Sequence, residues 1–240
     1  MTGLIAALGL SACGIGIVQP VRPLATTDES RTVVLMGDSI MWQAESAIKA
    51  ELERAGLHAT VHFRAVKGES LLADPARRRV RDAIRETGAD IVVMAWTGND
   101  LSSPNAGSDA WHRAWNRELE AVIADVRSLG AEPYVVSPPP FARRTRTNRV
   151  SYDAGIVASM TGAGHVSWWR ALQAEDCRVW VSDGKGGLTE GTSCFAFDLL
   201  YPEDGDVRKV RWNEGAHMQD PWGVWRVARW TASSISREWR

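Results

Sequence analysis

The sequence lacks the features that mark several classes of protein. It has only three cysteines in 240 residues, with no Cys-x-x-Cys pair and no cluster of histidines, so it does not predict a zinc or other metal site. Its 28 Lys and Arg residues nearly balance its 29 Asp and Glu residues, and a formal net charge of -1 gives no sign of a nucleic-acid-binding surface. No internal repeat or low-complexity tract is present. The chain is 45% hydrophobic, which is enough for one substantial core and predicts one domain.

The first 30 residues differ in composition from the rest of the chain. Gly3 to Val18 is apolar and rich in small residues, but its glycines make it a poor membrane-spanning helix, which needs roughly 18 or more apolar residues. We predict an export signal and linker over residues 1–30. Leu10-Ser11-Ala12-Cys13 matches a bacterial lipoprotein box and predicts a cell-envelope lipoprotein with its lipid on Cys13. No Lys or Arg precedes the apolar run, so a plain secreted protein and a buried or disordered N-terminus stay open.

The other two cysteines, Cys177 and Cys194, are 17 positions apart (194 − 177 = 17) with turn-rich sequence between them. We predict a disulfide that closes this loop and stabilises the fold by about 3 kcal/mol. It would staple an irregular excursion or hairpin at about 177–210, where Gly, Asp and Thr are frequent. Two unrelated buried thiols are the alternative.

From residue 31 onward, short β-rich runs alternate with longer helical ones. Strands are expected at 32–36, 59–66, 91–95, 133–136 and 165–168, and helices at 42–55, 75–87, 111–129, 152–160 and 222–234. This alternation is typical of a parallel sheet with helices on both faces. We predict an α/β protein, a three-layer α/β/α sandwich with a mostly parallel five-stranded sheet, over residues 31–240.

Polar and glycine residues follow the expected strands and precede the last helix. The four segments are Gly37-Asp38-Ser39-Ile40, Lys67-Gly68-Glu69-Ser70, Thr97-Gly98-Asn99-Asp100 and Glu214-Gly215-Ala216-His217. Functional groups of open α/β sheets collect at the carboxyl ends of the strands, so these segments are the candidate site. Ser39 opens a helix, whose N-terminus favours developing negative charge. Asp38 and Asp100 are expected to brace the loops rather than react.

These segments, in this order, resemble the four sequence blocks of the SGNH/GDSL hydrolases. Ser39, Gly68, Asn99 and His217 stand in the places of the four family letters, and the resemblance covers the chain from about Thr32 to about Trp230. It implies a flavodoxin-like fold, no cofactor or metal, Ser39 as nucleophile and His217 as its general base. It also implies three oxyanion donors: the backbone N–H groups of Ser39 and Gly68 and the side-chain amide of Asn99.

The sequence departs from the family pattern at Glu214, three residues before His217, where the family carries an Asp that orients the imidazole. Glu is one methylene longer, so the loop has to adjust. We expect Glu214 to be the third catalytic residue. A Ser39–His217 dyad, and orientation by a backbone carbonyl or by Asp206, are the alternatives.

Four residues are weaker candidates for substrate binding. Trp42 and Trp96 flank the Ser39 and Asn99 segments and suit sugar rings or acyl chains, although both could instead pack helices onto the sheet. Arg143 and Arg144 belong to the arginine-rich run 141–149 after the fourth strand, where they suit an anionic substrate. A solvated basic loop is the alternative.

Together, these features predict a serine hydrolase that cleaves carboxylic esters of an O-acetylated or O-acylated glycan or of a lipid, at the cell envelope or outside the cell. We expect a monomer without nucleic-acid partners, in contact with a membrane only through a lipid on Cys13. An O-acyltransferase with the same acyl-enzyme and a non-catalytic carbohydrate-binding module on this scaffold are the alternatives.

Overall fold

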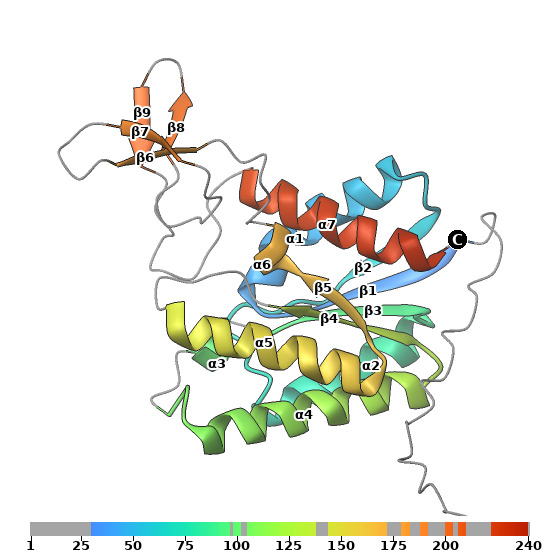
Figure 1. Ribbon diagram of the computed structural model, residues 1–240. Helices are drawn as coiled ribbons and strands as arrows, with labels where there is room; N and C mark the ends of the chain where they lie inside the picture. Colours follow the sequence, from blue (N-terminus) through green and yellow to red (C-terminus); the bar gives the residue numbers. More distant parts are fainter. Residues whose placement is uncertain are drawn as a thin grey trace, which may run out of the picture.

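The computed structural model describes residues 30–96, 98–101, 105–137, 144–171, 179–182, 188–191, 200–203, 206–209 and 222–239 (Figure 1). Its central sheet consists of β1 (Arg31–Gly37), β2 (Ala59–Phe63), β3 (Ile91–Ala95), β4 (Glu132–Ser137) and β5 (Gly164–Ser167). The strands lie in the order β2-β1-β3-β4-β5, and every neighbouring pair is parallel. This is the flavodoxin-like order, so the predicted fold class is confirmed.

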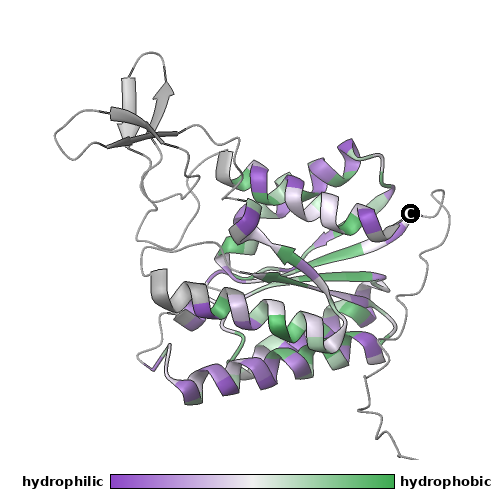
Figure 2. Cartoon of the chain, in the orientation of Figure 1, coloured by the Kyte–Doolittle hydropathy of each residue, from purple (hydrophilic) through white to green (hydrophobic). Residues whose placement is uncertain are grey.

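Helices cover both faces of the sheet, as Figure 1 shows. One face carries α1 (Ser39–Arg54) and α7 (Trp222–Trp239). The other face carries α2 (Asp74–Thr87), α4 (Asp109–Ser128) and α5 (Arg144–Thr161). Two further helices, α3 (Gly98–Leu101) and α6 (Trp168–Ala171), are short. Alternate residues of β1 serve the two cores, because side chains along a strand alternate between faces. Val33 and Leu35 pack with α1 and α7, whereas Val34 and Met36 pack with α2, α4 and α5. Figure 2 shows apolar residues on the sheet and polar residues on the outer helix faces.

A second, smaller sheet falls within the predicted insertion at about 177–210. It contains β6 (Val179–Ser182), β7 (Leu188–Gly191), β8 (Leu200–Glu203) and β9 (Asp206–Lys209), in the order β7-β6-β8-β9 with antiparallel pairing. The described residues here form paired strands, including the antiparallel pairs β6–β7 and β8–β9, where an irregular excursion or a hairpin was expected. Cys13, Cys177 and Cys194 lie outside the described residues, so the lipid anchor and the disulfide stay predictions.

Most helix boundaries differ slightly from expectation, and α1 shows a physical reason. It begins at Ser39 rather than at residue 42 because the Asp38 carboxylate accepts a hydrogen bond from the Ile40 N–H at 2.9 Å, which caps the helix. α5 begins at Arg144, well before the expected residue 152, and α7 continues to Trp239. None of the helices within the described ranges is both long and apolar enough to cross a lipid bilayer.

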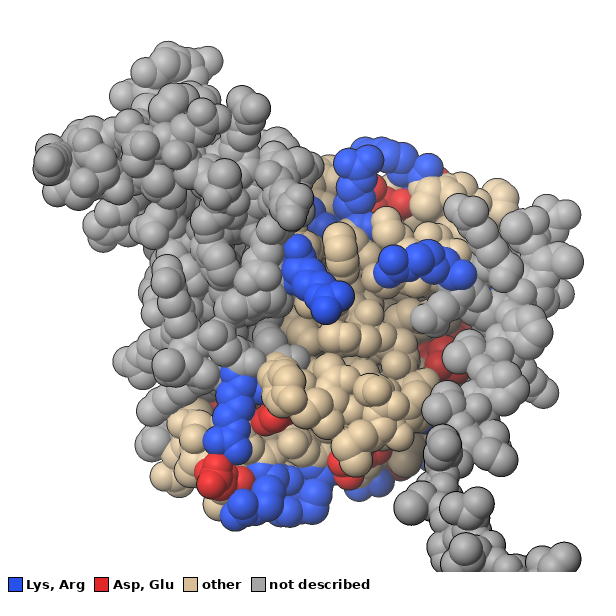
Figure 3. Space-filling model, in the orientation of Figure 1, with Lys and Arg blue, Asp and Glu red and all other residues tan. Residues whose placement is uncertain are grey.

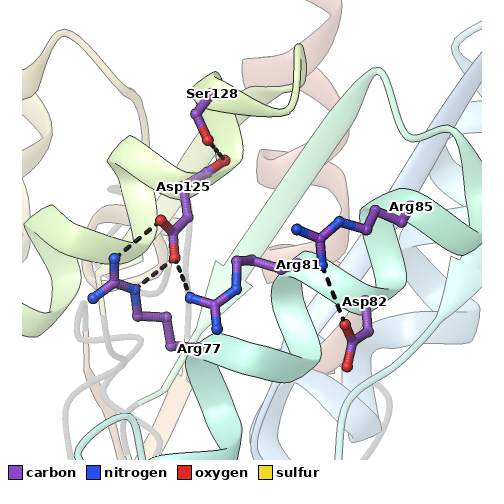
Figure 4. Close-up of polar contacts among 6 residues, drawn as sticks. All are labelled: Arg77, Arg81, Asp82, Arg85, Asp125 and Ser128. Atoms are coloured by element: carbon purple, nitrogen blue, oxygen red, sulfur yellow. Dashed lines mark hydrogen bonds and ion pairs between the residues drawn. The ribbon is translucent and has the colours of Figure 1, made fainter.

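A cluster of charged side chains joins α2 to α4; we call Arg77, Arg81 and Asp125 the α2–α4 seam. Both guanidinium groups point from α2 to the same carboxylate (Figure 4). Arg77 Nη2 donates to Asp125 Oδ1 at 3.0 Å, and Arg81 Nη1 donates to Oδ2 at 2.8 Å. The outer surface of α5 differs from this seam, since Figure 3 shows a largely uncharged area there and Tyr152 and Met160 are exposed.

Candidate active site

Ser39 stands at the carboxyl edge of the sheet, where β1 passes directly into α1. Gly37 lies opposite Ala95 of β3 and has a φ of +140°; a Cβ there would lie 2.1 Å from the Ala95 carbonyl oxygen, so only glycine fits. The next residue, Asp38, is fully buried and donates its N–H to the same Ala95 oxygen at 3.1 Å. Ser39 is thus held between the sheet and the first turn of α1, and it is partly exposed.

The turn that contains Gly68 is joined to this junction. Val66 donates its N–H to the Gly37 carbonyl at 2.8 Å, and Glu69 donates its N–H to the Val66 carbonyl at 3.1 Å. Gly68 lies between them with a φ of +83°, the left-handed region that favours glycine. The loop after β2 therefore closes beside the loop after β1.

Asn99, in the short helix α3, joins the third segment to the second. Its side-chain Nδ2 donates to the Glu69 backbone carbonyl at 3.1 Å. A primary amide carries two N–H donors, so this bond uses one and orients the other. The structure therefore gathers Ser39, Gly68 and Asn99 on neighbouring loops at one edge of the sheet.

A buried carboxylate, that of Asp100, accepts hydrogen bonds from the loop that follows Gly68. Asp100 is 2% exposed and accepts hydrogen bonds from the Ser70 hydroxyl, from the Leu71 N–H at 2.8 Å and from the Leu72 N–H at 3.3 Å. Burial raises the pKa of Asp100 above its ordinary value, and these bonds oppose that rise. Asp100 thus braces the loop at 70–72 and Asp38 caps α1, which agrees with the bracing role expected of both residues.

Glu69 provides a second buried support, which the sequence did not reveal. One of its carboxylate oxygens accepts from the Trp96 indole N–H at 2.9 Å, and the other accepts from the Arg79 guanidinium. Arg79 also donates to the Arg64 carbonyl at 2.8 Å, so it fastens the loop to α2. Trp96 is only 3% exposed. Its position agrees with the packing alternative rather than with a pocket lining.

Trp42 lies on the surface near Ser39. Trp42 is 48% exposed, and the Lys67 ammonium lies 3.5 Å from the centroid of its ring. Lys67 was not singled out from the sequence, because its contact with Trp42 joins residues 25 positions apart (67 − 42 = 25). Of the two tryptophans considered for substrate binding, Trp42 is the one with an accessible ring.

Three of the remaining site candidates, Glu214, His217 and Arg143, lie outside the described residues. Arg144 is the first residue of α5, and its side chain is not described either. The base, its orienting carboxylate and the substrate-binding role of Arg143 and Arg144 therefore rest on the sequence. The expected basic loop is wrong for residues 144–149, which belong to α5. In the described ranges, no group of three or more His, Cys, Asp or Glu residues is arranged to hold a metal ion.

A second histidine–carboxylate pair ties α4 to α5. His112 Nδ1 lies 2.7 Å from Asp153 Oδ2, and both residues are buried. Within the described part of the chain, His112 Nε2 has no hydrogen-bond partner, so the pair activates no serine there. No local motif marks these two residues, which explains why the sequence did not point to them.

Comparisons with known proteins agree with this geometry. The model of a family described as "Protein of unknown function (DUF459)" matches residues 32–223. No curated protein matches the chain. Solved structures with a similar fold include a GDSL-like lipase from Bacteroides thetaiotaomicron, with 13% identity, 86% of this chain and 88% of that chain covered, and a TM-score of 0.58.

Two further structures share the fold. A proposed acylhydrolase from Bacteroides fragilis is 14% identical over 91% of this chain and 92% of its own, with a TM-score of 0.59. The acetyl xylan esterase AlAXEase is 12% identical over 86% of this chain and 98% of its own, with a TM-score of 0.58. At these identities the likeness concerns the fold. The chain belongs to the family described as protein of unknown function (DUF459), which is associated with the SGNH hydrolases, and it has the fold of the SGNH/GDSL hydrolases.

Proposed function

We propose that the protein is a serine hydrolase that cleaves carboxylic esters through an acyl-enzyme on Ser39. One observation carries the proposal: hydrogen bonds from Val66 to Gly37 and from Asn99 to Glu69 collect the Ser39, Gly68 and Asn99 segments at one edge of the sheet. A hydroxyl at a helix N-terminus beside further N–H donors suits a reaction that develops an oxyanion. The lipase, acylhydrolase and esterase descriptions of proteins with this fold support the same reaction class.

The proposed reaction has two steps. Ser39 Oγ attacks the ester carbonyl while His217 takes its proton, and the oxyanion accepts hydrogen bonds from the backbone N–H groups of Ser39 and Gly68 and from Asn99 Nδ2. His217 then protonates the leaving alcohol, and water hydrolyses the acyl-enzyme. Glu214 orients the imidazole of His217. The parts given to His217 and Glu214 come from the sequence pattern.

We further propose that the substrate is an O-acetylated or O-acylated glycan or a lipid ester in the cell envelope or outside the cell. The acetyl xylan esterase and the GDSL-like lipase that share the fold act on esters of these two kinds by their names. The lipoprotein box at Cys13 and the pair Cys177 and Cys194 support export. The protein would act as a monomer, held at a membrane only by the lipid.

The direct test measures hydrolysis of 4-nitrophenyl esters from acetyl to long-chain acyl by the full chain and by Ser39→Ala. We expect Ser39→Ala to lower kcat by roughly 10³-fold or more, because no other group replaces the nucleophile. Asn99→Ala is expected to lower kcat by roughly 10²-fold with a smaller change in KM, because it removes one oxyanion donor.

Ser128→Ala is the matched control, since its hydroxyl donates to the Asp125 carbonyl at 2.8 Å near the end of α4, away from the Ser39 segment. It should hydrolyse the esters like the wild type. Turnover that persists in Ser39→Ala, together with no covalent labelling of the wild type by an organophosphonate, would contradict the proposal. Added acceptor sugars distinguish transfer from hydrolysis, because transfer yields an acylated sugar in place of the free acid.

A further inference from the structure

The pair formed by Lys67 and Trp42 places a positive charge beside the proposed site. The Lys67 Nζ lies 3.5 Å from the centroid of the Trp42 ring, within the range of a cation–π contact. A lysine side chain on the surface is otherwise flexible, and this contact holds its ammonium near one position. Trp42 remains 48% exposed, so the pair is open to a ligand.

Chain connectivity fixes where this charge lies. Trp42 follows Ser39 by three positions on α1, so the two side chains are neighbours on one face of the helix. Trp42 also donates its N–H to the Asp38 carbonyl at 3.0 Å, which places it in the first turn. Lys67 immediately precedes Gly68. The pair therefore joins the loop of the proposed nucleophile to the loop of the proposed oxyanion donor.

Three acidic side chains that the structure describes at this edge have other partners. Asp38 caps α1, Glu69 binds Trp96 and Arg79, and Asp100 binds the loop at 70–72. Within the described ranges, Lys67 makes no ion pair, whereas Lys49, farther along α1, pairs with Glu53. The Lys67 ammonium is thus available to bind an anionic group that lies outside the described part of the chain. Its ammonium has three N–H donors, and a ring contact leaves donors for anionic oxygens.

We infer that Lys67 and Trp42 determine specificity for an ester that carries an anionic group, a carboxylate or a phosphate, next to the scissile bond. The inference rests on the proposed ester hydrolysis and names its class of substrate. Lys67 binds the anionic oxygens, and the Trp42 ring packs against the neighbouring carbon atoms of the acyl chain or sugar. The charge can belong to the acyl part or to the alcohol part, and matched substrates separate these two cases.

The experiment compares kcat/KM for two pairs of esters that differ in charge. 4-Nitrophenyl hemisuccinate against 4-nitrophenyl butyrate tests a charge on the acyl part, and 4-acetoxybenzoate against its methyl ester tests a charge on the alcohol part. We expect the wild type to favour the anionic ester of one pair, and Lys67→Met to lower that ratio by about tenfold, mainly through KM. Higher salt should reduce the wild-type preference in the same direction.

Lys49→Met is the matched control, because it removes an exposed lysine from the same helix as Trp42 and should keep the wild-type ratio. Equal ratios in the wild type and Lys67→Met for both pairs would overturn the inference, while Ser39-dependent turnover would leave the proposed hydrolysis intact. If no ester is turned over, the proposed hydrolysis fails, and binding decides the inference alone. Calorimetry with monomethyl succinate and with 4-acetoxybenzoate should then show that at least one probe binds Ser39→Ala/Lys67→Met more weakly than Ser39→Ala. If the two variants bind each probe with the same affinity, the inference is overturned.

Discussion

The carboxyl edge of the sheet and the α2–α4 seam both use carboxylates, but in different surroundings. At the edge, Asp38, Glu69 and Asp100 are between 0% and 7% exposed, and each accepts hydrogen bonds from a neighbouring loop or helix end. At the seam, the side chain of Asp125 is 17% exposed and its two arginine partners are 37% and 33% exposed. The first arrangement fixes backbone positions, and the second links two helix surfaces.

The carboxylates at the edge position the site, whereas the carboxylate at the seam contributes to stability. A buried carboxylate loses hydration, so its net contribution to folding is small or unfavourable even when its bonds are good. Its bonds nevertheless fix the loops around Ser39, Gly68 and Asn99 in one arrangement. The seam loses less hydration and is screened by water, so it contributes modestly and positions nothing at the site. Substitutions at the edge should therefore have larger effects than substitutions at the seam.

The largest expected effect is that of Gly37→Ala. The new Cβ would lie 2.1 Å from the Ala95 carbonyl oxygen at a φ of +140°, so β1 and β3 would have to separate. We expect the free energy of unfolding to fall by at least about 3 kcal/mol, from strain and overpacking together. Urea denaturation followed by circular dichroism measures this change.

Gly130→Ala, at the end of α4, is the matched control. Its φ is +88°, but nothing lies within 4 Å of the added Cβ, so only conformational strain of about 1–2 kcal/mol is expected. Equal losses in the two variants would show that the edge is no more tightly packed than the end of α4.

Much of the edge could be predicted from the sequence, because its signals are local. Strand runs followed by Gly37, Gly68 and Asn99 place these residues at the carboxyl end of a sheet, and the alternation of elements predicts that the sheet is parallel. The strand at 91–95 was predicted to the residue. The nucleophile segment and the Asp38 cap of α1 are short-range features of this kind.

The contacts that support and surround the site could not be predicted in the same way. Glu69 with Trp96, Lys67 with Trp42, and His112 with Asp153 join residues far apart in sequence, and no periodicity connects them. They depend on how loops and helices meet in three dimensions. The early start of α5 at Arg144 was missed for a related reason, because the arginine-rich run has no apolar period that marks a helix.

The second expected effect is a difference in the sign of pH dependence between Asp100→Asn and Asp125→Asn. Burial raises the pKa of Asp100 above its ordinary value of 3.8. Between 3.8 and that higher pKa the folded protein binds more protons than the unfolded chain, so this group lowers stability as pH rises. The Arg77 hydrogen bond lowers the pKa of Asp125, so this group stabilises the fold above pH 3.8 and loses that contribution as pH falls through its folded pKa.

Urea denaturation of the wild type and both variants from about pH 3 to pH 7 tests these signs. Relative to the wild type, Asp100→Asn should gain stability as pH rises through the window above 3.8, and Asp125→Asn should lose stability as pH rises through the window below it. If the stability difference between variant and wild type changed with pH in the same direction for both variants, the two carboxylates would not be in contrasting surroundings.

The smallest expected effect comes from the arginines of the seam. Arg77 donates through both Nε and Nη2 and engages both oxygens of Asp125, whereas Arg81 donates once. After discounting for solvent screening, we expect Arg77→Gln to lower the free energy of unfolding by about 1 kcal/mol and Arg81→Gln by about 0.5 kcal/mol. Both losses should shrink in 1 M salt, and exposed Arg78→Gln is the control without a described partner. If Arg81→Gln lowered the free energy of unfolding as much as Gly37→Ala, substitutions at the edge would not have larger effects than substitutions at the seam, and the comparison would fail.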